Sequence, residues 1–334
     1  MEAAQEMALT NQGPTETSQD AGPWQQEEPL PMSTTFKIVV YVVGTPLAIA
    51  IIIVNVLLLV LLQKYPKLQT KTSMMMRSWC VLDLFTGVLV AFLVGVVSIS
   101  WSYEKYKYLC LFWLSLNNIP FLLTWSHVVF IAIDRYMAIK FPSRYTDGIS
   151  EGRLRCYLAV AWIYAILLSC LTFFWHAPAV VDGQCSFIVH HKYYNLLLLL
   201  LHCIPCVSVA VLLYAKSFLH VRRHERQVHV THTLAQDQFQ ADHMSTKAFF
   251  FITVLHTFTW MPYFIAIVCR LGQPIIYSSL YLTTNIGLVC GFTNAATKMA
   301  IYVTRHQDIR ESLKDLFESN KRPVRVPSRA CSRP

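Results

Sequence analysis

The sequence carries little charge for its length. Of its 334 residues, 14% are Asp, Glu, Lys or Arg and 54% are hydrophobic, whereas soluble domains contain about 25% charged residues. This deficit argues against an ordinary soluble domain and points to a protein embedded in a membrane.

Two features of many secreted chains are also missing. No basic stretch followed by a short apolar run marks a signal peptide, so we expect the first hydrophobic segment to target the chain. No Asn-x-Ser/Thr sequence occurs, so N-glycosylation is not expected.

Residues 1–36 contain six acidic residues and no Lys or Arg, and they are rich in Gln, Pro, Thr and Ser. This composition predicts a disordered extracellular arm.

Long apolar runs dominate the rest of the chain. Runs of about 18 or more residues with few charges indicate transmembrane helices, and continuous rather than alternating hydrophobicity favours helices over a β-barrel. The predicted fold is therefore all-α, a seven-transmembrane helix bundle within residues 37–303. The expected spans are 37–63, 74–99, 108–133, 156–175, 193–215, 248–269 and 277–303.

The basic residues predict the orientation of these spans. The loops around 64–77, 135–155 and 216–247, with the tail 305–334, hold 22 Lys and Arg, and the opposite side holds five. The basic side faces the cytoplasm, which places the N-terminus outside and the C-terminus inside. The net charge of +9 follows from this topology, so no nucleic-acid partner is expected.

The third apolar run contains the most specific pattern. Cys110 and Arg135 are 25 residues apart, about 38 Å in a helix and enough to cross the membrane. Arg135 belongs to the triplet Asp134-Arg135-Tyr136. This segment resembles the third helix of rhodopsin-like (class A) G-protein-coupled receptors.

Matches to the same family continue in order along residues 37–318. Any one of these residues has an ordinary explanation as packing, a helix kink or an interfacial anchor, but their order and spacing together support the resemblance. The matching residues are Asn55, Asp83, Trp101, Trp162, Cys185, Pro205, Trp260 and Pro262. Residues 304–318 resemble the family's amphipathic helix on the cytoplasmic leaflet, and 319–334 form a basic tail expected to be disordered.

The resemblance implies a disulfide and a switch. Cysteine positions alone leave the pairing of Cys110 with Cys185 open, but the family joins these two positions. In the implied mechanism Trp260 senses the ligand, Pro262 kinks the sixth helix, and Arg135 is held by Asp134 and Asp242 until that helix swings outward. The expected coupling and activation residues are Asp134, Arg135, Tyr136, Asp242, Trp260, Pro262, Tyr302 and Tyr214.

The implied ligand pocket is apolar with a few hydrogen-bonding groups. Amine receptors place a ligand-binding aspartate where this chain has Asn117, so a protonated monoamine is disfavoured and a neutral or weakly polar small molecule fits better. Lys192 and Arg270 near the outer rim leave an anionic ligand open. The expected pocket residues are Asn117, Asn118, Phe121, Leu197, Leu201, His202, Tyr263, Phe264, Leu288 and Phe292.

The seventh segment departs most from the family. The Asn-Pro pair is replaced by Lys298-Met299, which puts an ammonium group inside an apolar span. In one interpretation Lys298 extends to the cytoplasmic surface. In the other, which we prefer, it pairs with Asp83 where the family binds a sodium ion. The implied buried polar centre is Asn55, Asp83, Thr124, Asn294 and Lys298.

Two further departures lie between the pocket and the cytoplasm. Tyr214 stands one residue later than the family's tyrosine, and His256 replaces the usual phenylalanine. The lysine also raises the possibility of a retinal protein. That is disfavoured, because Phe292 occupies the opsin lysine position and Asn294 replaces the aspartate of microbial rhodopsins.

The sequence predicts a receptor and not an enzyme, since no catalytic constellation lies outside the spans. No cofactor or metal is expected. The expected partners are a heterotrimeric G protein, an unknown small-molecule ligand and membrane lipids, with arrestin or a second receptor copy left open. The expected location is the plasma membrane. The alternative is an atypical receptor with weak or constitutive coupling, which acts as a silent or dimerising scaffold.

Overall fold

The computed structural model describes residue 38 and residues 40–98, 103–148, 150–174, 192–227, 234–271 and 278–319. This part of the chain contains seven helices long and apolar enough to cross a membrane, so the all-α seven-helix prediction is confirmed. In chain order they are η1 (Val40–Gly44) running into α2 (Thr45–Lys64), α3 (Lys71–Ser98), α4 (Tyr103–Lys140), α6 (Glu151–Phe174), α7 (Lys192–Leu198) continuing through η4 (Leu199–Cys203) into α8 (Ile204–Gln227), α9 (Leu234–Leu271) and α10 (Ser278–Arg305).

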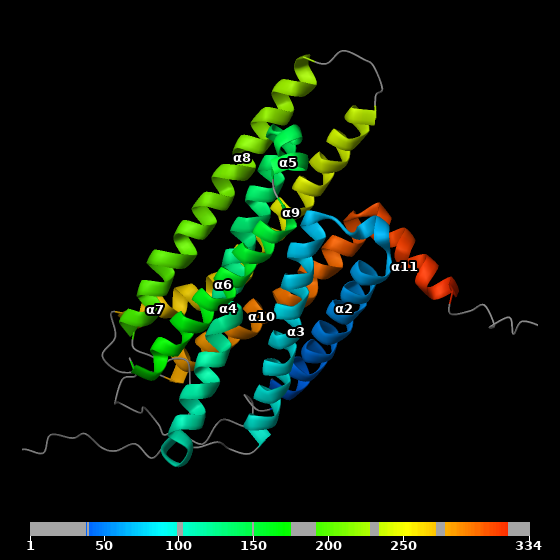
Figure 1. The fold of residues 1–334 in the computed structure, drawn as a ribbon. Helices are drawn as coiled ribbons and strands as arrows, with labels where there is room; N and C mark the ends of the chain where they lie inside the picture. The colour runs from blue at the N-terminus through cyan, green and yellow to red at the C-terminus, as the bar shows by residue number, and fades with distance from the viewer. Residues whose placement is uncertain are drawn as a thin grey trace, which may run out of the picture.

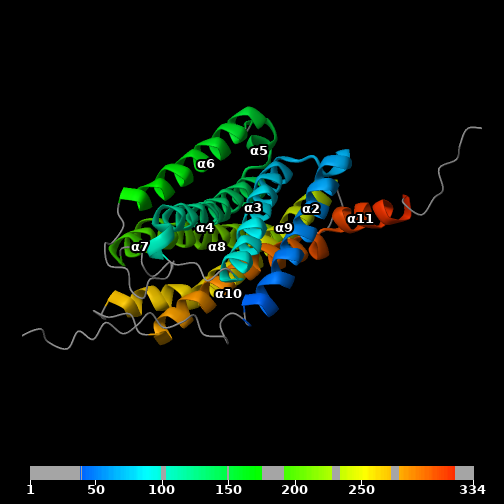
Figure 2. The same cartoon turned by 90° about the horizontal axis from the view of Figure 1, so that it is seen from below.

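Helix α4 occupies the middle of the bundle. It packs against α3, α6, α8 and α9, and Leu122, Leu123 and Trp125 on it are fully buried. Helix α6 lies at the margin, against α4 and α3 (Figure 2). The apolar residues on its outer face, Tyr157, Val160, Ile163 and Leu167, are exposed, as expected of side chains that face lipid.

The connection predicted over 216–247 is mostly helical. Helix α8 continues to Gln227, and α9 already begins at Leu234. Neither 216–227 nor 234–247 contains a Gly or Pro that would end a helix. The two helices therefore extend beyond the rest of the bundle, at the end that also carries α5 (Pro142–Gly148) and α11 (Gln307–Ser319) (Figure 1).

Helix α11 is amphipathic and follows α10 directly. Its apolar positions Ile309, Leu313 and Leu316 pack against the core. On its polar side, Lys67 Nζ in η2 (Pro66–Leu68) lies 3.4 Å from Glu311 Oε2. Hydrogen bonds from Gln307 and Lys67 lower the pKa of Glu311. These contacts hold α11 against η2 and the end of α10.

Two glycines allow α9 and α10 to approach closely. A Cβ at Gly287 would lie 2.6 Å from the backbone nitrogen of Tyr263, and a Cβ at Gly291 would lie 2.7 Å from the indole of Trp260. Their spacing of four puts both on one face of α10. Small residues at such positions let membrane helices pack backbone to backbone, so this pair sets the separation of α9 and α10 beside Pro262.

Gly287→Ala should lower the thermal unfolding midpoint of the purified receptor, because the new methyl group meets backbone atoms of α9 that cannot move aside. Overpacking of this kind costs about 1–3 kcal/mol. Gly95→Ala on α3 is the matched control, since no atom lies within 4 Å of its Cβ position. Equal midpoints for the two variants would show that the close approach is not required.

Candidate functional site

A buried arginine joins three helices at the end of the bundle that carries α5 and α11. Arg135, at the end of α4, is 4% exposed. Its Nη2 lies 2.5 Å from Asp134 Oδ2, and its Nη1 lies 3.2 Å from Asp242 Oδ1 on α9. It also donates to Ser245 Oγ on α9 at 3.3 Å and to Thr72 Oγ1 on α3. The guanidinium therefore holds the N-terminal part of α9 against α4 and α3.

The carboxylate of Asp134 is fully engaged as an acceptor. Thr72 Oγ1 donates to its Oδ2 at 2.9 Å, and Tyr145 Oη on α5 donates to its Oδ1 at 2.8 Å. Burial and the negative charge of Asp134 raise the pKa of Tyr145, so the phenol keeps the proton that it donates. Thr72, Ser245 and Tyr145 were not identified from the sequence, because nothing in their spacing links them to Arg135.

A histidine packs beside this network. His306, directly after α10, lies 3.4 Å from Ser245 Oγ through Nε2, and its ring centroid is 4.4 Å from that of Tyr302. Phe249 on α9 contacts both rings. Burial, and then the positive charge of Arg135, lower the pKa of His306 to about 4. His306 is therefore neutral in the folded receptor at neutral pH.

Acidification should loosen this end of the bundle. Since the folded pKa of His306 lies below its ordinary value of about 6.5, the unfolded chain binds more protons between these values, and stability falls as pH falls through that window. We expect the thermal midpoint of the wild type to drop between pH 7 and pH 5 by more than that of His306→Gln. The comparison cancels the contributions of all other groups, because these are the same in both proteins. Parallel pH profiles would contradict the assignment.

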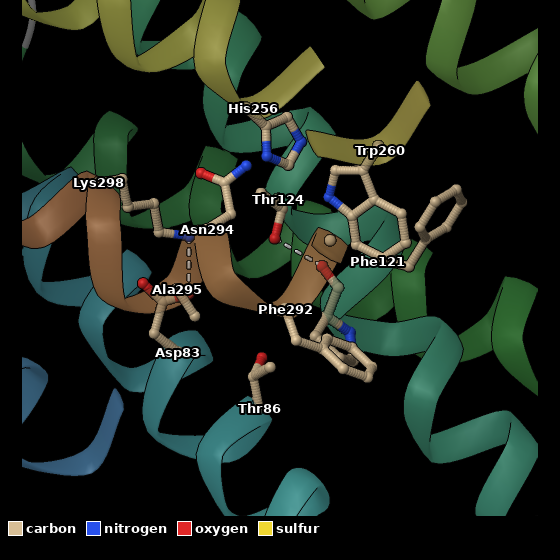
Figure 3. Close-up of a pocket in the computed structure, with 12 residues that line it drawn as sticks. Asp83, Thr86, Phe121, Thr124, His256, Trp260, Phe292, Asn294, Ala295 and Lys298 are labelled. Carbon is tan, nitrogen blue, oxygen red and sulfur yellow. Dashed lines mark hydrogen bonds and ion pairs between the residues drawn. The ribbon is translucent and has the colours of Figure 1, made fainter. Parts of the chain in front are cut away.

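A second ion pair lies deep inside the membrane-spanning bundle. Lys298 Nζ on α10 is 2.7 Å from Asp83 Oδ1 on α3, and each side chain is 2% exposed. The ammonium also lies 4.4 Å from the centre of the Trp79 ring, a favourable cation–π position. Figure 3 shows the lysine turned inward onto the aspartate. In this geometry Lys298 does not extend to the cytoplasmic surface.

A cavity of about 20 Å³ adjoins this pair, with room for roughly one water molecule. It is lined by Asp83, Thr124, His256, Asn294 and Lys298, among others. Thr124 Oγ1 donates to Pro120 O at 2.7 Å, and Asn294 Nδ2 donates to Thr259 Oγ1 at 2.6 Å. Within the described segments, Asp83 Oδ2, Asn294 Oδ1 and both ring nitrogens of His256 have no hydrogen-bond partner. Such buried atoms are usually satisfied by ordered water.

The first helix is tied to the same region. Asn55 Nδ2 donates to Ala295 O on α10 at 3.0 Å and to Ile51 O in its own helix at 2.8 Å. Ala295 lies between Asn294 and Lys298 along the chain. The buried polar residues proposed from the sequence therefore connect α2, α3, α9 and α10, and Thr124 on α4 lines the cavity beside them.

Removal of Asp83 alone should be more harmful than removal of both charges. Asp83→Asn leaves an ammonium without its counter-ion in a buried site, which costs about 3–5 kcal/mol. Asp83→Asn combined with Lys298→Met removes the pair together and should restore part of the lost thermal stability and surface expression. A double-mutant cycle measures the coupling. Additive losses would show that the two groups do not interact.

An aromatic cluster lies above this polar centre. The Trp260 ring centroid is 5.0 Å from that of Phe121, 5.6 Å from that of Tyr263 and 6.2 Å from that of Phe292. Phe264 contacts Phe121 and Trp125, and Leu288 is buried on α10. Trp260 thus separates the expected ligand region from the cavity beside Asp83, and Figure 3 shows its indole between Phe121 and His256.

The polar residues expected in the pocket are buried, and some of their side-chain atoms already make hydrogen bonds to other groups of the protein. Asn117 Nδ2 donates to Trp113 O in its own helix at 2.8 Å, and Asn118 is buried beside it. His202 Nε2 lies 3.0 Å from Leu122 O, and its Nδ1 lies 3.2 Å from Tyr164 Oη on α6. His202 therefore links α6, α4 and the π-helical turn η4.

The prediction that Leu197 and Leu201 line the pocket is wrong. Leu197 is 40% exposed and Leu201 is 69% exposed, on the outer surface of the bundle. Leu201 lies in the π-helical turn Leu199–Cys203, whose wider winding buries His202 and turns the neighbouring Leu201 outward. Leu197 precedes this turn, on α7. The buried leucines of this segment are Leu198 and Leu199.

The remaining predicted switch residues lie in the same half of the bundle as Arg135. Tyr214 is buried on α8 and packs on Phe250, with ring centroids 5.6 Å apart. Tyr302 packs between Phe249 and His306, and Tyr136 Oη accepts from Lys140 Nζ at 2.7 Å. The predicted disulfide between Cys110 and Cys185, and the side chains of Lys192 and Arg270, lie outside the described residues.

Comparison with known proteins decides the family. The sequence profile of the 7 transmembrane receptor (rhodopsin family) matches residues 54–314. The chain belongs to the rhodopsin family of seven-transmembrane receptors. Its family couples to G proteins, so this is a G-protein-coupled receptor and a multi-pass membrane protein, and its relatives are receptors rather than enzymes.

Several curated relatives of this rhodopsin-family receptor are amine receptors. The histamine H2 receptor of Rattus norvegicus is 24% identical over 295 residues, 85% of this chain and 81% of its own length. Human trace amine-associated receptor 5 is 22% identical over 288 residues, 83% and 84% of the two chains. The octopamine receptor beta-2R of Drosophila melanogaster is 26% identical over 193 residues, 55% and 36% of the two chains. The resemblance to the amine branch is thereby confirmed.

Proposed function

We propose that this receptor carries an extracellular or membrane-borne small-molecule signal to a heterotrimeric G protein by outward movement of α9. The observation that supports this most directly is the position of Arg135. The ion pair with Asp242 and the hydrogen bond to Ser245 hold α9 against α4, which is a closed cytoplasmic face. Movement of α9 away from α4 breaks both contacts and exposes the guanidinium to a partner.

The path from the ligand region to this face runs along α9. Trp260 contacts Phe121 on α4 and Phe292 on α10, and Pro262 lies inside α9 two residues later. Because a proline removes one backbone hydrogen bond and bends a helix, a rearrangement of the aromatic cluster changes the direction of the helix below it. A ligand shifts the receptor toward the open state by its difference in affinity for the two states.

The ligand is proposed to be a neutral or weakly polar small molecule rather than a protonated monoamine. The relatives include receptors named for histamine, trace amines and octopamine, yet Asn117 stands where the resemblance to amine receptors places an aspartate for the ligand cation. The donor group of Asn117 is taken by Trp113 O. The surrounding rings of Phe121, Tyr263 and Phe264 supply apolar surface.

The receptor is proposed to lie in the plasma membrane with its N-terminus outside and its C-terminus in the cytoplasm. The unequal distribution of Lys and Arg supports this orientation. The basic tail would attract anionic lipid. Binding of arrestin or of a second receptor copy would use the same cytoplasmic and lipid-facing surfaces.

A weakly coupled or constitutively active receptor is the second candidate. The observation that favours it is the Lys298–Asp83 ion pair, which links α10 to α3 through a charge that belongs to the chain itself. The intact network around Arg135 favours the signalling receptor.

Nucleotide exchange on a panel of G proteins distinguishes the two candidates. Asp242→Ala should raise basal exchange about fivefold, because loss of a partly exposed ion pair of about 1 kcal/mol favours the open state. Arg135→Ala should abolish exchange. Glu151→Ala is the matched control, since it removes the carboxylate of an exposed pair with Arg155 on α6. Unchanged basal exchange in Asp242→Ala at equal surface expression would contradict the proposed role of the Arg135–Asp242 ion pair. Absence of exchange on every G protein of the panel would favour the silent receptor.

A further inference from the structure

The resemblance implies a sodium ion beside Asp83, but the residues around this carboxylate do not suit one. The carboxylate that would hold the ion has its Oδ1 bonded to the Lys298 ammonium at 2.7 Å. One negative charge thus already faces one positive charge, and both are buried. A further cation would add an uncompensated charge to a site that is neutral without it.

The space and ligands that remain also argue against a cation. The cavity beside the pair is about 20 Å³, and Lys298 itself is part of its lining. A sodium ion near Asp83 Oδ2 or Asn294 Oδ1 would lie close to an ammonium of the same sign. The unpartnered nitrogens of His256 provide sites that a neutral water can satisfy, since water both donates and accepts. The residues therefore do not fit a bound sodium ion, and they do fit a single water molecule.

We propose that Lys298 is this receptor's permanent internal cation, and that the receptor therefore does not bind sodium at its polar centre. Because the ammonium is attached to α10 and its counter-ion to α3, this charge cannot dissociate into the surrounding solution. The link between α3 and α10 is then independent of the salt composition on either side of the membrane. The Lys298–Asp83 pair exists without a G protein, so the absence of sodium binding does not depend on G-protein coupling.

The test measures thermal unfolding of the detergent-purified full-length receptor in sodium chloride and in choline chloride at equal ionic strength. The wild type should unfold at the same temperature in both salts. Lys298→Asn restores the family's residue, and its midpoint should rise by about 2 °C or more in sodium. Asp83→Asn combined with Lys298→Asn should lose that response. The matched control is Lys67→Asn, which removes a surface lysine paired with Glu311 and should show no sodium response.

Either of two results overturns the proposal. A sodium-specific rise in the wild-type midpoint would show that a cation binds despite Lys298. A stable Lys298→Asn variant that ignores sodium would show that the lysine is not what excludes the ion. The wild-type comparison alone decides the matter if Lys298→Asn does not fold, because it needs no variant.

Discussion

The need to neutralise charge inside a membrane determines the two buried ion pairs of this receptor. A charged side chain within the hydrocarbon region is expensive unless it is paired, and this chain buries Arg135 and Lys298 in apolar spans. Each is matched by a carboxylate from another helix, Asp242 in one case and Asp83 in the other. The same physical requirement therefore creates two inter-helix links, one at the end of the bundle near α5 and one at its centre.

The two links differ in the ease with which they break. Asp242 is 21% exposed, so water can replace its contact with Arg135 when α9 moves. Asp83 and Lys298 are almost completely buried, and the cavity that adjoins them has room for about one water molecule. Separation of the central pair would leave two uncompensated charges in the interior of the bundle. In the proposed function, helix α9 is therefore the element that moves, and α3 and α10 form the frame against which it moves.

The sequence predicted what depends on local composition and missed what depends on tertiary contact. The seven spans follow from apolar runs, and Arg135 and Trp260 follow from motifs, so these were visible in the chain. Leu201 was misplaced, because a π-helical turn changes the winding by one residue and leaves no periodic signal. Tyr145 and His306 reach Asp134 and Ser245 from separate segments, and no spacing rule joins them. The extension of α8 and α9 could have been recognised from the absence of Gly and Pro.

The close contact of α9 with α10 has a mechanical consequence. Gly287 and Gly291 bring the helices together beside Tyr263 and Trp260, next to Pro262, so this contact would be the pivot of the proposed movement of α9. The part of α9 from Leu234 to Pro262 is about 42 Å long at 1.5 Å per residue. A tilt of about 10° at this pivot would carry its free end through about 7 Å. In the proposed function, a small rearrangement around the Trp260 ring would thus become a large displacement of the end of α9 where a G protein would bind.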